Sequence, residues 1–350
     1  MVKVVQLSRS DGSLEEHKII QLQNPVFSFS TLQISNHYKR QSEFEGELIK
    51  NTRNNMLILS IALLLIAAFI GVFYKFWTAD GDFTLLSKGH VKREEIEDKV
   101  IWITGASRGI GEILAKQLAS LGAKLIISAR NEAELERVKK QLAGKHAPDE
   151  VMILPLDLTS GEDKLREAVQ QAESLFSGAG VDYLIHNAAF ERPKTTALDV
   201  TEQSLKMSSA AGKTPAPGQA VYSASKFAVN GYFHSLRSEL YRKGIKVTVV
   251  CPGPIKTSST PEASTSSTKL PAERRVSSER CAELTTIAAS HGLKEAWISY
   301  QPVLAVMYLV QYVPTIGFWL MDKVGARRVE AAAKQGDTYS LALLFGKKKE

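Results

Sequence analysis

The stretch Lys99-Val-Ile-Trp-Ile103, followed at once by Thr104-Gly-Ala-Ser-Arg-Gly-Ile-Gly111, decides the fold. The apolar run predicts a buried strand, and the residues after the turn have helical periodicity. Strand, glycine turn and helix in this order form a cradle for a phosphate group, because the helix N-terminus presents its N–H groups to an anion. We expect Gly105 to permit the turn, Gly109 to let the backbone approach the phosphate, and Gly111 to allow close helix packing. The spacing differs from the common G-x-G-x-x-G, so the turn needs support from the rest of the chain.

Three further apolar runs predict more strands, at residues 123–128, 151–156 and 181–185. Helical segments separate them, and strands that alternate with helices form a parallel sheet covered on both faces. The expected fold class is therefore α/β, a doubly wound parallel sheet of the Rossmann type. Ligands of such sheets bind at the carboxyl ends of the strands, where the glycine turn also lies.

The residues after the second strand favour NADP(H) over NAD(H) as the cofactor. Ala129 stands where an acidic residue would bind the ribose hydroxyls of NAD, Arg130 follows it, and Arg108 lies in the glycine turn. Two guanidinium groups without a carboxylate suit a 2′-phosphate. The simpler interpretation is that Arg130 is only the first exposed residue after a strand. It accounts for Arg130 but not for Arg108 as well. Asp157 and Leu158, after the third strand, are candidates for contact with the adenine edge.

A hydroxyl, a phenol and an ammonium stand at the spacing that a carbonyl reductase needs. Ser209 precedes Tyr222 by thirteen residues and Lys226 follows it by four, which on a helix places Lys226 one turn away on the same face. A nearby ammonium lowers the pKa of a phenol from its usual value of about 10, so Tyr222 could exchange a proton with a substrate oxygen near neutral pH. Ser209 would donate a hydrogen bond to that oxygen. The alternative is an ordinary helix start, since Tyr-x-x-x-Lys is common by chance.

A membrane anchor is predicted before the globular part. Residues 56–73 contain no charge, and Tyr74, Phe76 and Trp77 follow as interfacial side chains. A buried soluble helix and a cleaved signal peptide are the alternatives. Similar numbers of Lys and Arg flank the run on its two sides, so they do not determine the orientation of the anchor. A product that begins at Met56 would carry positive charge only after the anchor, which would put the catalytic domain in the cytosol. The lysines at 347–349 resemble an endoplasmic-reticulum retrieval signal or form a solvated tail, so we expect a single-pass membrane protein of that compartment.

The composition and charge limit the classes of molecule that the chain is expected to bind. The chain of 350 residues is 44% hydrophobic and 23% charged, which indicates a globular protein, and its net charge of +7 is dispersed. Dispersed charge argues against nucleic acid and is consistent with membrane lipid and a phosphorylated cofactor. Cys251 and Cys281 are too few for a disulfide framework and lack metal-ligand spacing, so no metal is expected. The expected divisions are a polar extension at 1–55, the anchor at 56–77, a linker at 78–97, the reductase domain at 98–300 and an apolar helix with a basic tail at 301–350.

At these positions the chain resembles the short-chain dehydrogenase/reductase superfamily. The glycine turn, Asn187-Ala188, Ser209, Tyr222-x-x-x-Lys226 and Pro252-Gly253 follow one another in the family's order. The resemblance implies that Lys226 also binds the nicotinamide ribose, that Thr257 reaches the carboxamide, and that the substrate is a small lipophilic carbonyl or alcohol of steroid, retinoid or xenobiotic type. It leaves a homodimer open. The cofactor contacts that it implies are Thr104, Gly105, Ser107, Arg108, Gly109, Ile110, Gly111, Arg130, Asp157, Leu158, Asn187, Tyr222, Lys226, Pro252, Gly253, Ile255 and Thr257.

The sequence departs from this family where Ser209 should be supported. His186 and Ala189 replace residues of the family's usual Asn-Asn-Ala-Gly motif, and both could crowd the cofactor. Only residues 190–206 are left for a crossover and the next strand, whereas a parallel β-α-β unit takes roughly 30 residues or more. Residues 202–207 are too polar for a strand covered on both faces. We therefore infer that one coding block is absent between Lys206 and Met207. Two rival interpretations follow, a catalytically impaired truncated isoform that is a non-enzymatic membrane protein, and a lipid-binding scaffold.

The C-terminal third carries fewer signals. A helix that includes Tyr222 is expected to continue over residues 227–242, followed by a strand at 246–251 and a short helix at 280–290. The Ser- and Thr-rich residues 258–271 are either a lid over the substrate or a surface linker. Residues 302–321 are mostly apolar, and they form either a second membrane contact or a core or dimer helix.

Overall fold

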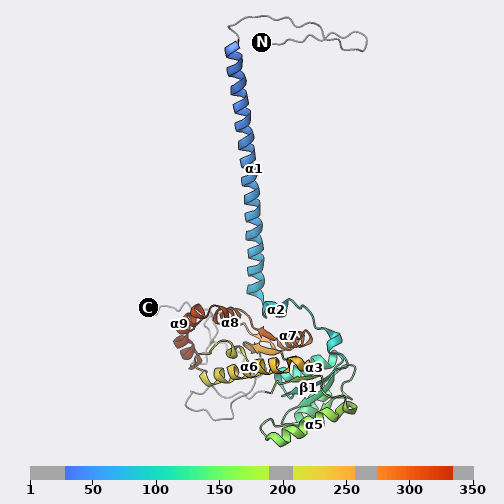
Figure 1. Ribbon diagram of the computed structural model, residues 1–350. Coiled ribbons are helices and arrows are strands. Elements are labelled where there is room, and N and C mark those ends of the chain that lie inside the picture. Colours follow the sequence, from blue (N-terminus) through green and yellow to red (C-terminus); the bar gives the residue numbers. More distant parts are fainter. Residues whose placement is uncertain (1–27, 189–207, 257–273, 334–350) are drawn as a thin grey trace, which may run out of the picture. The chain divides into compact units, whose positions relative to one another are not determined.

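The computed structural model describes residues 28–188, 208–256 and 274–333 (Figure 1). The chain divides into two compact units, Met1–Tyr74 and Lys75–Glu350. In the first unit, the described residues belong to one long helix, α1 (Ser28–Thr78). Residues 28–55, which belong to the expected polar extension, are helical. Glutamate, lysine, arginine and glutamine are frequent between residues 39 and 53, and these side chains lose little freedom in a helix.

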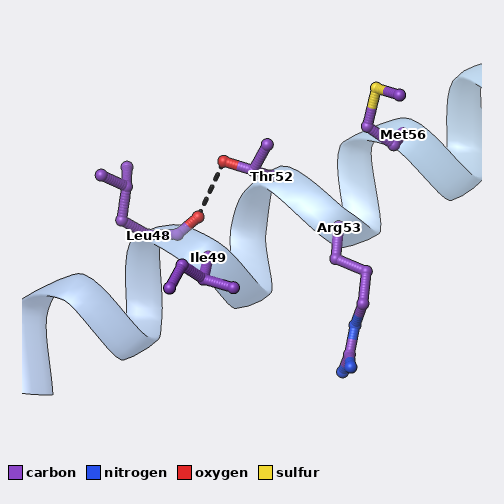
Figure 2. Close-up of a pocket in the computed structure, with 5 residues that line it drawn as sticks. All are labelled: Leu48, Ile49, Thr52, Arg53 and Met56. Atoms are coloured by element: carbon purple, nitrogen blue, oxygen red, sulfur yellow. Dashed lines mark hydrogen bonds between the residues drawn. The ribbon is translucent and has the colours of Figure 1, made fainter.

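The α1 helix carries the candidate membrane span. Its segment Lys39–Thr78 is long and apolar enough to cross a bilayer. The eighteen uncharged residues 56–73 rise about 27 Å as a helix, which is close to the thickness of the hydrocarbon core. Figure 2 shows five side chains at the start of this run, Leu48, Ile49, Thr52, Arg53 and Met56, which line a shallow pocket. A single helix lines it, so it does not enclose a ligand.

The second unit alternates strands and helices as predicted. Its first half contains α2 (Phe83–Leu86), η1 (Arg93–Glu95), β1 (Val100–Thr104), α3 (Gly109–Ser120), β2 (Lys124–Ser128), α4 (Glu132–Lys140), β3 (Met152–Ile153), α5 (Glu162–Gly178) and β4 (Tyr183–Ile185). Its second half contains η4 (Ala210–Gly212), α6 (Ala220–Leu240), η5 (Tyr241–Lys243), β5 (Val249–Pro252), β6 (Ile255–Lys256), β7 (Val276–Ser277), α7 (Ser278–Ser290), β8 (Glu295–Ile298), α8 (Val303–Tyr312) and α9 (Pro314–Ala333).

Four parallel strands form the main sheet, in the order β3-β2-β1-β4. All five residues of β1 are buried, because helices cover both faces of the sheet. Ile101 and Ile103 pack into the cluster that contains residues of α3 and α4, whereas Val100 and Trp102 pack with alanines of α5. This alternation is the period-two pattern of a strand between two helical layers.

The rest of the sheet is separate. β5 pairs with β8, and β6 pairs with β7, both in parallel. Among the described residues, β4 pairs with β1 alone and β5 with β8 alone, so the expected single sheet is divided between β4 and β5. Leu184 in the middle of β4 is 45% exposed, which is unusual for a strand of a doubly wound sheet. The segment predicted to supply the intervening strand, residues 190–207, lies outside the described residues.

Residues 78–97, predicted as a linker, belong to the domain. Asp82 caps α2 by accepting a hydrogen bond from Leu85 N at 2.9 Å. The same side chain accepts one from Trp297 N at 2.6 Å, while its backbone N donates to Trp297 O at 2.9 Å. Asp80 pairs with Arg280 of α7 at 2.8 Å. The two carboxylates therefore fix the chain beside β8 directly after α1 ends.

Candidate active site

The glycine turn is joined to the end of β4 by close backbone contacts. Gly105 has a φ of +69°, and a Cβ there would lie 2.6 Å from the Cα of Ala188. Asn187 Nδ2 donates to the carbonyl oxygens of Thr104 at 3.2 Å and Gly105 at 3.1 Å. A Cβ at Gly111 would overlap the Gly105 carbonyl and the Asn187 amide. The family positions Thr104, Gly105, Gly111 and Asn187 are thus brought together.

The helix N-terminus beside this turn is open. Gly109 begins α3 with a φ of +61°, and a Cβ there would meet nothing within 4 Å. The first N–H groups of a helix have no intrahelical acceptor, so those of Gly109 and Ile110 are available to an anion. The space that a phosphate needs and the N–H groups that would bind it therefore occur at the same place.

Arg137 of α4 braces the turn, and the sequence did not reveal it. Its guanidinium donates to the Ser107 carbonyl oxygen at 2.9 Å and pairs with Glu112 at 2.9 Å. The hydrogen bond between Arg137 and Glu112 raises the pKa of Arg137 and lowers that of Glu112. The partners are 25 or more residues apart in sequence, so no local pattern predicts the contact.

The residues proposed to recognise the cofactor's adenosine half lie at the strand ends as expected. Arg108 is the N-cap residue of α3, Arg130 follows β2, and both side chains are exposed. Leu156 N donates to Ala129 O at 3.0 Å, so the third strand continues beside β2 toward Asp157 and Leu158. The Asp157 carboxylate accepts from Thr159 N at 2.9 Å and from Thr159 Oγ1 at 2.8 Å. Its first role is thus to hold the turn after β3.

Ser209 is the N-cap residue of η4. Its hydroxyl donates to the Pro252 carbonyl oxygen at 3.3 Å and accepts from Ala211 N at 3.3 Å. The motif residues Ser209 and Pro252, which are 43 positions apart, therefore meet directly. The serine sits in an extended backbone at the end of its segment, half-buried rather than enclosed in the core.

A buried amide on α6 fixes the segment that carries Ser209, and sequence reasoning missed it. Asn230 is 4% exposed, and its Nδ2 donates to Gly212 O at 2.9 Å. Its Oδ1 accepts a short hydrogen bond from the hydroxyl of Ser208. A Cβ at Gly212 would lie 2.8 Å from Lys226 O, so η4 and α6 touch through their backbones. The signal available in the sequence was the i, i+4 spacing of Asn230 from Lys226.

Tyr222 and Lys226 lie together on α6, as the spacing predicts. The Lys226 Nζ is 4.9 Å from the centre of the Tyr222 ring. The Tyr222 side chain is 45% exposed, whereas Lys226 is only 4% exposed. Burial lowers the pKa of Lys226 to about 8, because a low-dielectric surrounding disfavours the charged form. At neutral pH the side chain is still mostly protonated, so an ammonium lies against the phenol.

The half that carries the glycine turn meets the half that carries α6 at His186, and it also packs against α7. The ring of His186, after β4, lies 5.6 Å from that of Phe233 on α6, and burial lowers the pKa of this histidine. Ile110 and Ile255 both pack against the apolar cluster around α7. His186 therefore packs between the halves, a role that the sequence did not suggest. Thr257 lies outside the described residues.

The cysteines are unsuited to chemistry. Cys251 and Cys281 are buried and unpaired with each other, and burial raises their pKa values to about 11 and about 12. Neither would be a thiolate at neutral pH. Within the ranges that the structure describes, no group of three His, Cys, Asp or Glu side chains could hold a metal ion.

Known proteins are similar to this chain in sequence and in fold. The family model for short chain dehydrogenases matches residues 99–207 and 203–267, in two segments that overlap at residues 203–207. Dehydrogenase/reductase SDR family member 7 of Homo sapiens is 34% identical over 317 residues, which cover 79% of this chain and 91% of that protein. Its counterpart in Mus musculus is 33% identical over 298 residues, 73% of this chain and 87% of that protein. The fold is similar to that of a short-chain type dehydrogenase/reductase from Mycobacterium ulcerans, at 19% identity and a TM-score of 0.51 over 63% of this chain and 96% of that one.

The alignment with the human relative contains an informative gap. It is 317 positions long, but 79% of the 350 residues here is about 277, so about 40 aligned positions have no counterpart in this chain, a number close to the size of one β-α-β unit.

Proposed function

Because the chain belongs to the short-chain dehydrogenase/reductase family, we propose that it is a membrane-anchored, NADP(H)-dependent oxidoreductase that interconverts a carbonyl and an alcohol on a lipophilic substrate. The observation that carries this proposal is the arrangement on α6, where a buried ammonium lies 4.9 Å from the ring of the Tyr222 phenol. A buried lysine with a lowered pKa is costly to the fold, and such groups concentrate at functional sites.

The residues of the glycine turn fit a dinucleotide phosphate. The open space at Gly109, the free N–H groups at the start of α3 and the bracing by Arg137 and Asn187 together form an anion site. Arg108 and Arg130 would pair with a 2′-phosphate, which supports NADP(H) over NAD(H). The exposure of both guanidiniums leaves them available to a ligand at the surface.

The three motif side chains have different tasks. When bound, the nicotinamide supplies or accepts the hydride. Tyr222 transfers a proton to or from the substrate oxygen, and Ser209 donates a hydrogen bond to that oxygen as charge develops on it. Lys226 stabilises the phenolate of Tyr222 electrostatically and binds the nicotinamide ribose. Asn230 and the Ser209–Pro252 hydrogen bond hold these groups in place.

A mostly apolar groove lies at the start of α6, on residues other than Tyr222. The groove has a volume of about 690 Å³ and is lined by Ser223, Ala224 and Phe227 of α6, by Pro217 before that helix, and by Phe318 and Met321 of α9 among others. The candidate membrane span in α1 would keep the enzyme where lipophilic molecules concentrate. We place the enzyme in the endoplasmic reticulum with its catalytic domain in the cytosol.

The test is turnover by the full chain in detergent micelles. NADPH consumption with a panel of lipophilic ketones is expected for the natural chain, and Tyr222→Phe should reduce it at least 100-fold, since general acid–base catalysis contributes about that much. NADPH should still raise the melting temperature of both proteins. Equal turnover by both proteins would refute the role of Tyr222, and no protection by NADPH would favour the lipid-binding scaffold.

Several observations favour a second candidate, a truncated isoform with impaired catalysis. The described sheet is divided between β4 and β5, Leu184 is exposed, and about 40 positions of the human relative have no counterpart here, close to one β-α-β unit. On α6, Phe227 and Tyr232 are also exposed, at 43% and 63%. We infer that a helix and a strand encoded between Lys206 and Met207 cover these groups in a longer form.

Sequencing of the transcripts tests this second candidate. A longer form with an apolar strand at the junction, more active per molecule than this chain, would support it. If no longer transcript exists, or if both forms turn over equally, the inference of an absent block fails.

A further inference from the structure

The turn between α8 and α9 exposes an unusual number of large apolar side chains. Tyr312 is 72% exposed, Trp319 55%, Ile316 52% and Val313 43%, and we refer to these four residues as the hairpin tip. Soluble proteins seldom leave a contiguous apolar surface uncovered unless it has a partner. The remainder of α8 behaves differently, because Leu304, Met307 and Val310 are buried in the domain. The prediction of a core helix is thus confirmed for one face of α8 and does not account for the tip.

The two helices of the hairpin pack closely against each other near the hairpin tip. A Cβ at Gly317 would lie 2.6 Å from Val310 Cα and 2.7 Å from Val310 N, which shows that α9 crosses α8 with the two backbones in contact. Gly317 N donates to Val313 O at 3.0 Å, and Val313 N donates to Leu309 O at 2.8 Å. In this arrangement the four tip residues are left exposed.

The residues that follow the membrane span dock against α8. Phe76 O accepts a hydrogen bond from Gln301 Nε2 at 3.0 Å, and Gln301 Oε1 accepts from Ala305 N at 2.9 Å. The Phe76 ring lies 6.2 Å from that of Tyr308, which in turn stacks at 6.0 Å on Tyr312 of the tip. Only two ring-to-ring steps thus separate the tip from Phe76, and Phe76 follows the last residue of the uncharged run by three positions.

The chemistry of the tip is that of a bilayer interface. Tyrosine and tryptophan are enriched at the level of lipid headgroups, with a cation on the polar side. Here the ammonium of the exposed Lys323 lies 4.7 Å from the centre of the Trp319 ring. A basic side chain next to an aromatic one suits anionic headgroups above acyl chains.

We propose that the hairpin tip inserts into the interface of the same bilayer that α1 spans, and that anionic lipid strengthens the contact. The domain is then held to the membrane at two places, the end of α1 and the hairpin tip. Phe318 and Met321 line the apolar groove from the same helix that carries Ile316 and Trp319. A lipophilic molecule could therefore pass from the bilayer to the groove along α9; this last step alone rests on the proposed function.

A depth measurement on the full chain tests the proposal. Both natural cysteines are buried, so a cysteine at Ile316→Cys can be labelled selectively with an environment-sensitive fluorophore. Glu173→Cys provides the matched control, because Glu173 is exposed on α5, at the end of the domain away from α8 and α9 (Figure 1). Each labelled chain is reconstituted in phosphatidylcholine vesicles with and without phosphatidylserine, and quenching by spin-labelled acyl chains is recorded.

The expected result is strong lipid quenching at position 316, little at 173, and an increase at 316 with phosphatidylserine. Lys323→Glu in the 316-labelled chain should lower the effect of phosphatidylserine. Equal lipid quenching at the two positions would overturn the proposal. A second result would also overturn the proposal. If the fluorophore at position 316 is protected from water, is not quenched by the lipid quenchers, and becomes more protected as the protein concentration rises, then a second copy of the chain covers the tip.

Discussion

Replacement of Lys226 by methionine should make the folded chain more stable while it removes activity. The lysine is 4% exposed and its pKa is lowered from 10.5 to about 8 by burial. Between pH 8 and pH 10.5 the unfolded chain therefore binds more protons at this site than the folded chain does, and stability rises with pH across that window. Below pH 8 the folded chain bears the whole cost of the buried charge. Methionine has a similar length and carries no charge to desolvate.

The magnitude follows from the two pKa values. The difference of about 2.5 units corresponds to about 3 kcal/mol at pH 7, and it falls to about 1 kcal/mol at pH 10. Loss of the contact with the Tyr222 ring and of other interactions of the ammonium offsets part of this gain, so we expect Lys226→Met to gain about 1 to 3 kcal/mol at pH 7.

Urea unfolding of the full chain in detergent micelles, at pH 7 and at pH 10, measures the effect. Lys164→Met is the control, because Lys164 is exposed on α5 and should change stability by less than about 0.5 kcal/mol at either pH. The reasoning is refuted if Lys226→Met is less stable than the natural chain at pH 7, or if its stability difference is the same at both pH values.

Three further predictions concern the nucleotide half. Gly111→Ala should lower the free energy of unfolding by about 1–3 kcal/mol, since its Cβ overlaps the Gly105 carbonyl. Gly109→Ala should lower it by about 1 kcal/mol through backbone strain, and for each kcal/mol of stability lost it should weaken NADPH binding more than Gly111→Ala does. Urea unfolding and NADPH titration measure both effects, and a larger loss of NADPH affinity per kcal/mol in Gly111→Ala would contradict the prediction. Arg108→Ala and Arg130→Ala should each raise the KM for NADPH about 10-fold and leave that for NADH nearly unchanged, whereas equal effects on both cofactors would exclude 2′-phosphate recognition. Arg137→Met should lower the free energy of unfolding by about 1–2 kcal/mol and weaken NADPH binding. The control Arg166→Met removes an exposed ion pair with Glu162 and should change neither quantity. Equal losses in the two variants would show that Arg137 does not brace the turn.

Local patterns predicted the nucleotide half well. The apolar side chains of β1 favour a buried strand, and the glycines after it tolerate a positive φ. Both tendencies belong to the residue types, so the sequence alone predicts these conformations. Tyr222 and Lys226 are four residues apart, so helix geometry alone places them on the same face. Each of these features depends on neighbours in the sequence.

The remaining features depend on distant partners. Arg137 braces Ser107 from another helix, and Asn230 reaches Ser208 from α6. The crossing of α8 and α9 at Gly317 depends on contact with Val310, so the exposed tip was not evident in the apolar residues 302–321. The division of the sheet beside β4 was not predicted, although the link to Ser209, which is too short for a β-α-β unit, indicated that a coding block is absent there.

Transfer of a deuterium label tests the central claim most directly. The full chain is incubated with a lipophilic ketone and NADPH in which both hydrogens at C4 of the nicotinamide are replaced by deuterium, and the alcohol is analysed by mass spectrometry. We predict one deuterium on the carbinol carbon, with the yield reduced at least 100-fold in Tyr222→Phe, in line with the contribution of a general acid–base residue. Alcohol without deuterium, or the same yield from both proteins, would contradict the account.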